Sequence, residues 1–146
     1  MNVSTNKRGT AELVDLPFSA YRHFEAMSNE LSTPKILLCP SDRRTEATNW
    51  ASLGNDRISY FVGINASENF PKTFLSGDRH LTNWLKPTNG FLELRRYSTR
   101  WLPRLHTNFG HIAFADGAVT ALPDAGLRKA LAETGDATNR IALPTP

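Results

Sequence analysis

The sequence predicts an α+β domain, in which an N-terminal helix packs on an antiparallel β-sheet of about four or five strands and a C-terminal helix follows the sheet. Three observations lead to this prediction. Apolar residues recur at helical spacing between residues 17 and 31, two short apolar runs flank Asp116-Gly117, and a second helical pattern follows Pro123-Asp124. A length of 146 residues with 40% hydrophobic content fits one domain with a single core.

The first helix is predicted over residues 17–31. Asp15 can cap it, and proline is tolerated in a first helical turn. The apolar residues that share one stripe are Ala20, Phe24, Met27 and Leu31. The helix ends before Pro34, because the residue that precedes a proline avoids the α conformation. Residues 1–16 lack periodicity and are predicted to form a flexible leader.

Strands are predicted where short apolar runs are bounded by turn residues. They cover residues 35–39, 58–63, 73–77, 91–94, 112–115 and 118–122. Both faces of 58–63 are largely apolar, which indicates a central strand, whereas 91–94 is predicted to be an edge strand. Between the first two strands, apolar residues at helical spacing predict a short helix over residues 43–53.

The pair Asp116-Gly117 is the strongest hairpin signal in the chain. Both residue types tolerate the positive φ that a type I′ turn requires. The final helix follows, with Leu127, Ala130 and Leu131 on one face, and Gly135 ends it. The sequence therefore predicts one domain over residues 17–135 and a flexible tail over 136–146.

The hairpin also carries a resemblance to a known family. His106, nine further residues and Asp116-Gly117 resemble the H-X9-DG motif near the C-terminal end of bacterial prepilin-like proteins, which are related to the type II secretion pseudopilins. Three upstream blocks are similar to blocks found in the same order in that family, so the match spans roughly residues 20 to 140. These blocks are 37–42, with Cys39, Pro40 and Asp42, then 58–63, and then 75–79, with Gly77 and Asp78.

The resemblance implies a pilin-like head domain that serves as a structural subunit of a pseudopilus or type IV pilus-like filament, related to type II secretion. Its partners would be other pilin-like subunits, and the full-length form would lie in the bacterial cell envelope, anchored in the inner membrane by an N-terminal helix. Family members begin with a leader and about 20 apolar residues. Residues 1–16 are instead polar, so the chain is either an excised soluble domain or a divergent relative without an anchor. As written, it is expected to be soluble.

The motif residues are predicted to have structural roles. His106 is expected to bind a backbone group or Asp116 and so to fix the start of the hairpin. Asp42 and Asp78 are expected to accept hydrogen bonds from backbone N–H groups at turns. Cys39 is the single cysteine, which excludes an internal disulfide, and it is predicted to be buried.

No catalytic residue is predicted. The chain has no Gly-x-Ser-x-Gly elbow, no phosphate-binding glycine loop and no His-Glu-x-x-His motif. A hydrolase in which Ser41 or Ser76 is activated by a histidine remains a remote alternative. The domain is therefore expected not to be an enzyme.

No cofactor is predicted either. In a strand, residues five positions apart face opposite sides, so the spacing of His106 and His111 does not favour a zinc site with Asp116. Calcium remains an alternative, because Asp42, Asp78 and Asp116 are oxygen donors at turn positions, although the chain has no acidic run at calcium-loop spacing.

The basic segment from Arg95 to Arg104 leaves a second function open. The chain has a net charge of +3, and four arginines in this segment interleave with Tyr97 and Trp101. This pattern could suit a nucleic-acid backbone with stacking aromatic rings. A solvated edge that faces a partner subunit is the favoured interpretation, since no nucleic-acid motif is present. The alternative to a filament subunit is thus an envelope module that binds calcium, glycan or nucleic acid.

Overall fold

The structure is a computed structural model that describes residue 4 and residues 9–144. In this part of the chain it is an α+β domain, as predicted, with an antiparallel sheet of six strands in the order β4-β8-β1-β2-β6-β7. Its strands are β1 (Tyr60–Gly63), β2 (Phe74–Asp78), β4 (Phe91–Glu93), β6 (Phe109–Phe114), β7 (Val119–Pro123) and β8 (Arg140–Ala142). A separate pair consists of β3 (Leu81–Thr82) and β5 (Arg100–Trp101).

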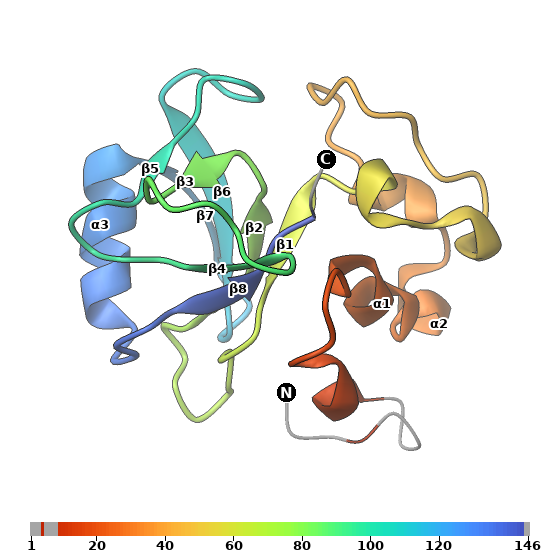
Figure 1. The fold of residues 1–146 in the computed structure, drawn as a ribbon, viewed down its shortest axis with the longest axis horizontal. Helices are drawn as coiled ribbons and strands as arrows, with labels where there is room; N and C mark the ends of the chain where they lie inside the picture. The colour runs from red at the N-terminus through yellow and green to blue at the C-terminus, as the bar shows by residue number, and fades with distance from the viewer. Residues whose placement is uncertain (1–3, 5–8, 145–146) are drawn as a thin grey trace.

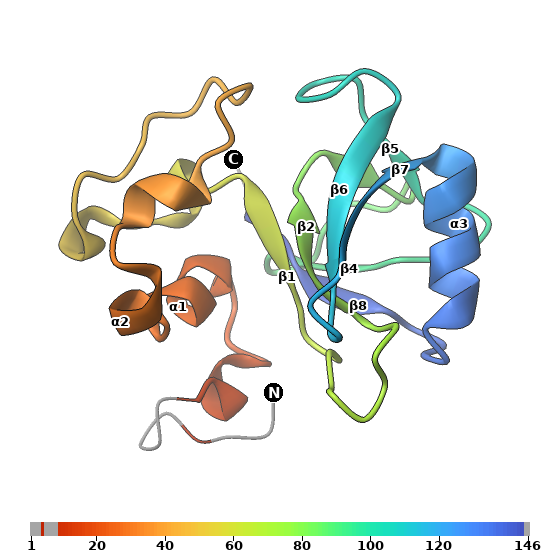
Figure 2. The ribbon, with the colours of Figure 1, turned by 180° about the vertical axis from the view of Figure 1, so that it is seen from behind.

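Two layers cover opposite faces of the sheet (Figures 1 and 2). The helix α3 (Asp124–Glu133) lies against one face, and the N-terminal segment, which contains α1 (Ala20–Glu25) and α2 (Ser28–Leu31), lies on the other side. Phe61 of β1 packs in the apolar cluster with α3, whereas Val62 packs in the cluster with α1. Both faces of β1 are thus buried, which confirms the prediction of a central strand.

The predicted hairpin is confirmed, but its turn is not of type I′. Within the turn only Gly117 has a positive φ, of 85°. The Gly117 N–H donates to the Phe114 carbonyl, and the Phe114 N–H donates to the Ala118 carbonyl. Residues 115–117 therefore form a three-residue loop that ends in a left-handed glycine.

We expect Gly117→Val to lower the free energy of unfolding by about 1–2 kcal/mol. A Cβ at Gly117 would meet no atom within 4 Å, so the cost comes from the positive φ and not from a clash. Urea unfolding of both proteins measures this cost. Gly117→Asn is the matched control, because asparagine tolerates the left-handed region, and it should lose clearly less. Equal losses would contradict the conformational explanation.

The predicted N-terminal helix is broken into two short helices. Ala20 and Phe24 are buried and Leu31 is partly buried against the same cluster, but Met27 between them is exposed, so the apolar stripe is interrupted at Met27. Most helical stability in proteins comes from packing of an apolar face, and α1 accordingly ends before Met27. The predicted cap is also wrong, because the Asp15 carboxylate accepts from Arg140 at 2.8 Å and α1 begins at Ala20.

Two further predictions in the N-terminal half are wrong. Residues 35–39 are not a strand, because Pro34 fixes φ at the start of a 3₁₀ turn whose Lys35 N–H binds the Thr33 side chain. Residues 43–53 are largely irregular, and the Arg44 guanidinium holds this segment by donating to the Ile58 carbonyl at 2.7 Å. The short 3₁₀ helices in the described residues are η2 (Ala11–Leu13), η3 (Pro34–Leu37), η4 (Trp50–Ser52) and η5 (Asn55–Arg57).

The predicted tail over 136–146 contains a strand. Residues 140–142 form β8, which pairs with β1 on one side and β4 on the other, and Ile141 and Ala142 are buried. This strand raises the sheet from the expected four or five strands to six. Three residues are too few to show alternation, so only tertiary pairing reveals β8. Residues 145–146 lie outside the described part of the chain.

The predicted leader over 1–16 is described at residue 4 and from residue 9 onward, and its other positions lie outside the described residues. Its described part includes η2, and its Asp15 is bound to Arg140 of β8. None of the helices that the structure describes is long and apolar enough to cross a membrane.

Candidate functional site

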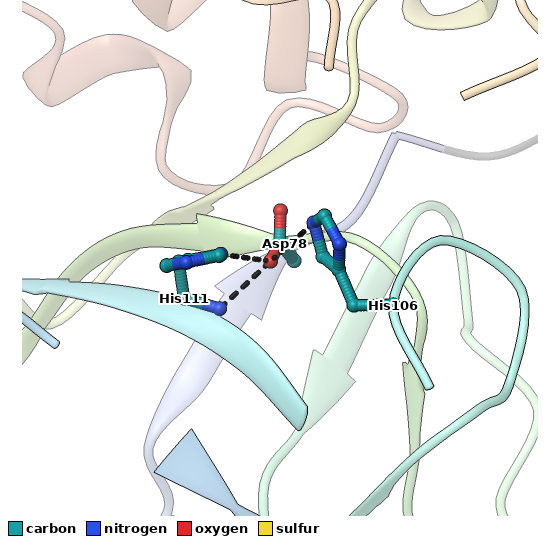
Figure 3. Close-up of side chains that lie close together, drawn as sticks. All are labelled: Asp78, His106 and His111. Carbon is teal, nitrogen blue, oxygen red and sulfur yellow. Dashed lines mark hydrogen bonds and ion pairs between the residues drawn. The ribbon is translucent and has the colours of Figure 1, made fainter. Parts of the chain in front are cut away.

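A cluster of one aspartate and two histidines lies at the end of β2. The sheet pairs Gly77 of β2 with Ile112 of β6, so the next residues on the two antiparallel strands, Asp78 and His111, lie side by side. His106 comes from the loop before β6 and points at the same carboxylate (Figure 3). Three segments of the chain thus meet at Asp78.

The contacts of the Asp78 carboxylate define this cluster. Its Oδ2 accepts from the His111 backbone N–H at 2.7 Å and lies 3.2 Å from His111 Nδ1 and 3.6 Å from His106 Nε2. The Asp78 side chain is 1% exposed, whereas those of His106 and His111 are 18% and 44% exposed. One ligand atom from each residue lies within 4.8 Å of the others. The cluster is therefore anchored in the core and open to solvent on the His111 side.

Gly77 allows the two strands to approach closely beside the cluster. A Cβ at this position would lie 2.7 Å from the His111 carbonyl oxygen and 2.8 Å from Cε1 of Phe61. Both distances are shorter than real contacts, so only glycine fits without movement of the backbone. The predicted structural role of Gly77 is thus the close approach that brings Asp78 to His111.

His106 does not have the predicted partner. Its ring stacks on Phe109 at 5.2 Å, and its Nε2 lies 3.7 Å from the Cys39 sulfur. Asp116 lies instead in the turn at the other end of β6, where it accepts from the Ala118 N–H. The proximity of the two histidine rings, 5.2 Å apart, also overturns the expectation that they face opposite sides.

The physical reason is the loop between the two histidines. β6 begins at Phe109, so His106 is not part of the strand whose alternation the spacing argument assumed. Asn108 has a positive φ of 64°, which redirects the chain immediately before β6. His106 is thereby placed next to His111.

A second network lies beside the cluster and is centred on Asp42. Arg79 donates two hydrogen bonds to its carboxylate, at 2.8 and 2.9 Å, and the Ser59 hydroxyl donates a third at 2.8 Å. The Ser59 hydroxyl in turn accepts from the Cys39 N–H. Burial favours the neutral acid, but the hydrogen bonds from Arg79 and Ser59 outweigh it and lower the pKa of Asp42 to about 2. Asp42 accepts one turn N–H, as predicted, from Arg44 at 3.4 Å.

Burial shifts the pKa values of two groups beside the two networks. Burial raises the pKa of Tyr60 to about 12, and the nearby carboxylates of Asp78 and Asp42 raise it further. His80 is buried against Trp101, and desolvation lowers its pKa.

The residues predicted from the sequence are thus partly brought together. Cys39 is buried and free, as predicted, and Pro40 follows it in an exposed turn. Among the described residues, the metal-competent group of three or more is Asp78, His106 and His111, so Asp42 and Asp116 do not join Asp78 as a calcium site. The proposed nucleophile Ser76 donates to the Phe61 carbonyl rather than to a histidine.

Sequence reasoning missed three participants: His111 as a partner of Asp78, and Ser59 and Arg79 as partners of Asp42. Asp78 and His111 each lie one residue outside the strands predicted over 73–77 and 112–115, and they are 33 residues apart in the sequence. Their proximity depends on the antiparallel pairing of β2 with β6, which no local pattern reveals.

The basic segment is divided between surface and core. Trp101 is buried and donates from its indole nitrogen to the Leu122 carbonyl, so it cannot stack on a base. Arg100 lies over the Trp84 ring at 3.7 Å, and the exposed Tyr97 faces Arg96. One of the two aromatic rings that suggested nucleic-acid binding is therefore part of the core.

Comparisons of this chain with protein-family models, curated proteins and solved structures give no match.

Proposed function

We propose that this domain is a structural subunit of a pseudopilus or type IV pilus-like filament and that it acts by packing against neighbouring subunits. The observation that carries the proposal is an uncovered part of one sheet face, over β2, β6 and β7, next to an unpaired edge strand. The sequence resemblance to prepilin-like proteins supplies the class of neighbour.

The strand pairing defines the uncovered face. Val62 pairs with Ser76, Ser76 with Ala113, and Ala113 with Val119, so these side chains share one face of the sheet. Val62 is covered by the N-terminal segment, but Val119 is 66% exposed and Ala121 is exposed. The N-terminal layer therefore ends over β1 and leaves an apolar surface beyond it. Exposed apolar surface of this kind marks interaction sites.

The strand β7 adds a second means of contact. It stands at one end of the sheet order, and no strand of the described residues pairs with its outer side. An edge strand presents backbone N–H and C=O groups that a neighbouring chain can pair with. The exposed apolar surface and the free edge of β7 lie next to each other, so a neighbouring subunit can contact both at once.

The motif blocks also fit a structural role. Block 37–42 is joined to block 58–63 through Ser59, and to block 75–79 through the Arg79–Asp42 pair. In the described residues, none of the hydrogen bonds joins a serine to a histidine, which nucleophilic catalysis by Ser41 or Ser76 would need. These blocks support the packing of the domain more directly than they support chemistry.

Incorporation into filaments tests the proposal. A leader and membrane helix of the family type, fused ahead of residue 17, should allow the domain to enter sheared filaments of a cognate major subunit. Val119→Asp places a charge on the uncovered face, and we expect it to reduce incorporation by about tenfold or more. Immunoblots of the sheared fraction, normalised to the membrane fraction, measure the effect.

Ile36→Asp is the matched control, because Ile36 is also exposed but lies in η3 of the N-terminal segment and not on the sheet. It should enter filaments as the unchanged domain does. The proposal fails if the fused domain stays in the membrane fraction, or if the two aspartate variants behave alike. By light scattering, the chain without the fused helix should be a monomer or at most a weak dimer.

A further inference from the structure

We propose that Asp78, His106 and His111 bind a divalent transition-metal ion, and that zinc is the ion this site suits best. The proposed site lies at the end of β2, and the proposal does not depend on filament assembly. Three properties of the cluster carry it: the distances between the donor atoms, the buried charge of Asp78, and the types of donor.

The distances match a coordination site. Zinc binds nitrogen and carboxylate oxygen at about 2.0–2.2 Å, so neighbouring donors around a tetrahedral ion lie about 3.3–3.5 Å apart. Asp78 Oδ2 lies 3.2 Å from His111 Nδ1 and 3.6 Å from His106 Nε2. The ligand nitrogens of His106 and His111 lie within 4.8 Å of each other, and a small rotation of either ring would shorten that distance. An ion can therefore be held with little movement of the backbone.

The charge of Asp78 calls for a cation. The carboxylate is 1% exposed, and no lysine or arginine of the described residues forms an ion pair with it. A buried carboxylate is costly unless it is paired or coordinates a metal. Arg79, the next residue, is turned away to Asp42. The Asp78 carboxylate therefore interacts with the two histidines, either as the acceptor of their hydrogen bonds or as a ligand of the same metal ion.

The donor types favour zinc over calcium. Two imidazole nitrogens and one carboxylate oxygen suit zinc and other late transition metals, whereas calcium takes six to eight oxygens. The site offers three protein ligands and one open side, where His111 is 44% exposed. Three ligands and an open position are the arrangement of a four-coordinate zinc site that keeps one place for water.

The surrounding structure holds two of the ligands in position. The His111 backbone N–H fixes Asp78 Oδ2, and the Phe109 ring supports the His106 ring from one face. Groups that orient ligands in this way typically raise metal affinity. A bound ion would join β2, β6 and the loop before β6, so it should stabilise the start of the hairpin.

Cobalt(II) and zinc titrations of the metal-free chain test the proposal. We expect the intense visible absorption of four-coordinate cobalt at one equivalent, its loss on addition of zinc, and a dissociation constant for zinc in the micromolar range or below. The melting temperature should rise with zinc concentration and return to its starting value with chelator. Millimolar calcium should leave it unchanged.

His111→Ala removes an accessible ligand, and Asp78→Asn keeps the shape while removing the charge. Each should weaken zinc binding by at least about tenfold. Asp116→Asn, at the far end of β6, is the matched control and should bind as the unchanged chain does. Circular dichroism identifies any variant that fails to fold, and His111→Ala is the safer variant because its side chain is half-exposed. The proposal is overturned if cobalt gives no such absorption, if His111→Ala binds zinc unchanged, or if calcium alone shifts the melting temperature.

Discussion

Replacing Arg79 by methionine is expected to lower the free energy of unfolding at pH 7 by about 3 kcal/mol. The Asp42 side chain is 2% exposed, and Arg79 supplies two of its hydrogen bonds. Removing one partner of a buried ion pair leaves an uncompensated charge, which costs more than the pair contributes. The same change also removes the ion pair that joins the segment at Cys39 to the end of β2.

The pH dependence identifies the cause. The folded pKa of Asp42, about 2, lies below its ordinary value of 3.8, so its contribution is present above pH 3.8 and is lost as pH falls towards 2. Without Arg79, burial should raise that pKa instead. The difference in stability between the two proteins should therefore narrow as pH falls from 7 to 3.

Urea unfolding at several pH values measures both effects. Lys35→Met is the matched control, because it breaks an exposed ion pair with Glu46 and should cost at most about 1 kcal/mol. Adding Asp42→Asn to Arg79→Met should recover part of the loss. If that second substitution only adds to the loss, the buried charge is not the cause.

The sheet strands could be predicted because their signals are local. The short apolar runs of β1 and β2, and the Asp116-Gly117 turn between β6 and β7, depend on neighbours within a few positions. The short strand β8 has no such signal and exists through its pairing with β1 and β4. The N-terminal segment was predicted less well, because its conformation depends on side-chain bonds such as that from Arg44 to the Ile58 carbonyl.

The candidate site, like the fold, could be predicted from the sequence only in part. His106 was selected by its position in the motif, and Gly77 and Asp78 by the block that contains them. Their arrangement depends on the register of β2 with β6 and on the left-handed Asn108, neither of which leaves a periodic pattern. A spacing rule for regular strands therefore separated His106 from His111, although the loop brings their rings together.

Lowering the pH from 7.5 to 5 is expected to reduce the free energy of unfolding by about 2 kcal/mol through His23. This side chain of α1 is 2% exposed, and neither ring nitrogen has a hydrogen-bond partner. Burial lowers its pKa from 6.5 to about 4. The unfolded chain therefore takes up a proton between these values and the folded chain does not, so stability is complete above pH 6.5 and falls as pH decreases towards 4.

Urea unfolding of His23→Leu at both pH values tests this cause. Leucine fills a similar volume without a titrating group, so most of the loss between pH 7.5 and 5 should disappear. A smaller slope should remain, because burial also lowers the pKa of His80 and its contribution has the same sign. Lys35→Met should keep the full slope of the unchanged protein. A His23→Leu variant with that full slope would place the acid sensitivity elsewhere, and it would mean that α1 does not bury His23 in solution.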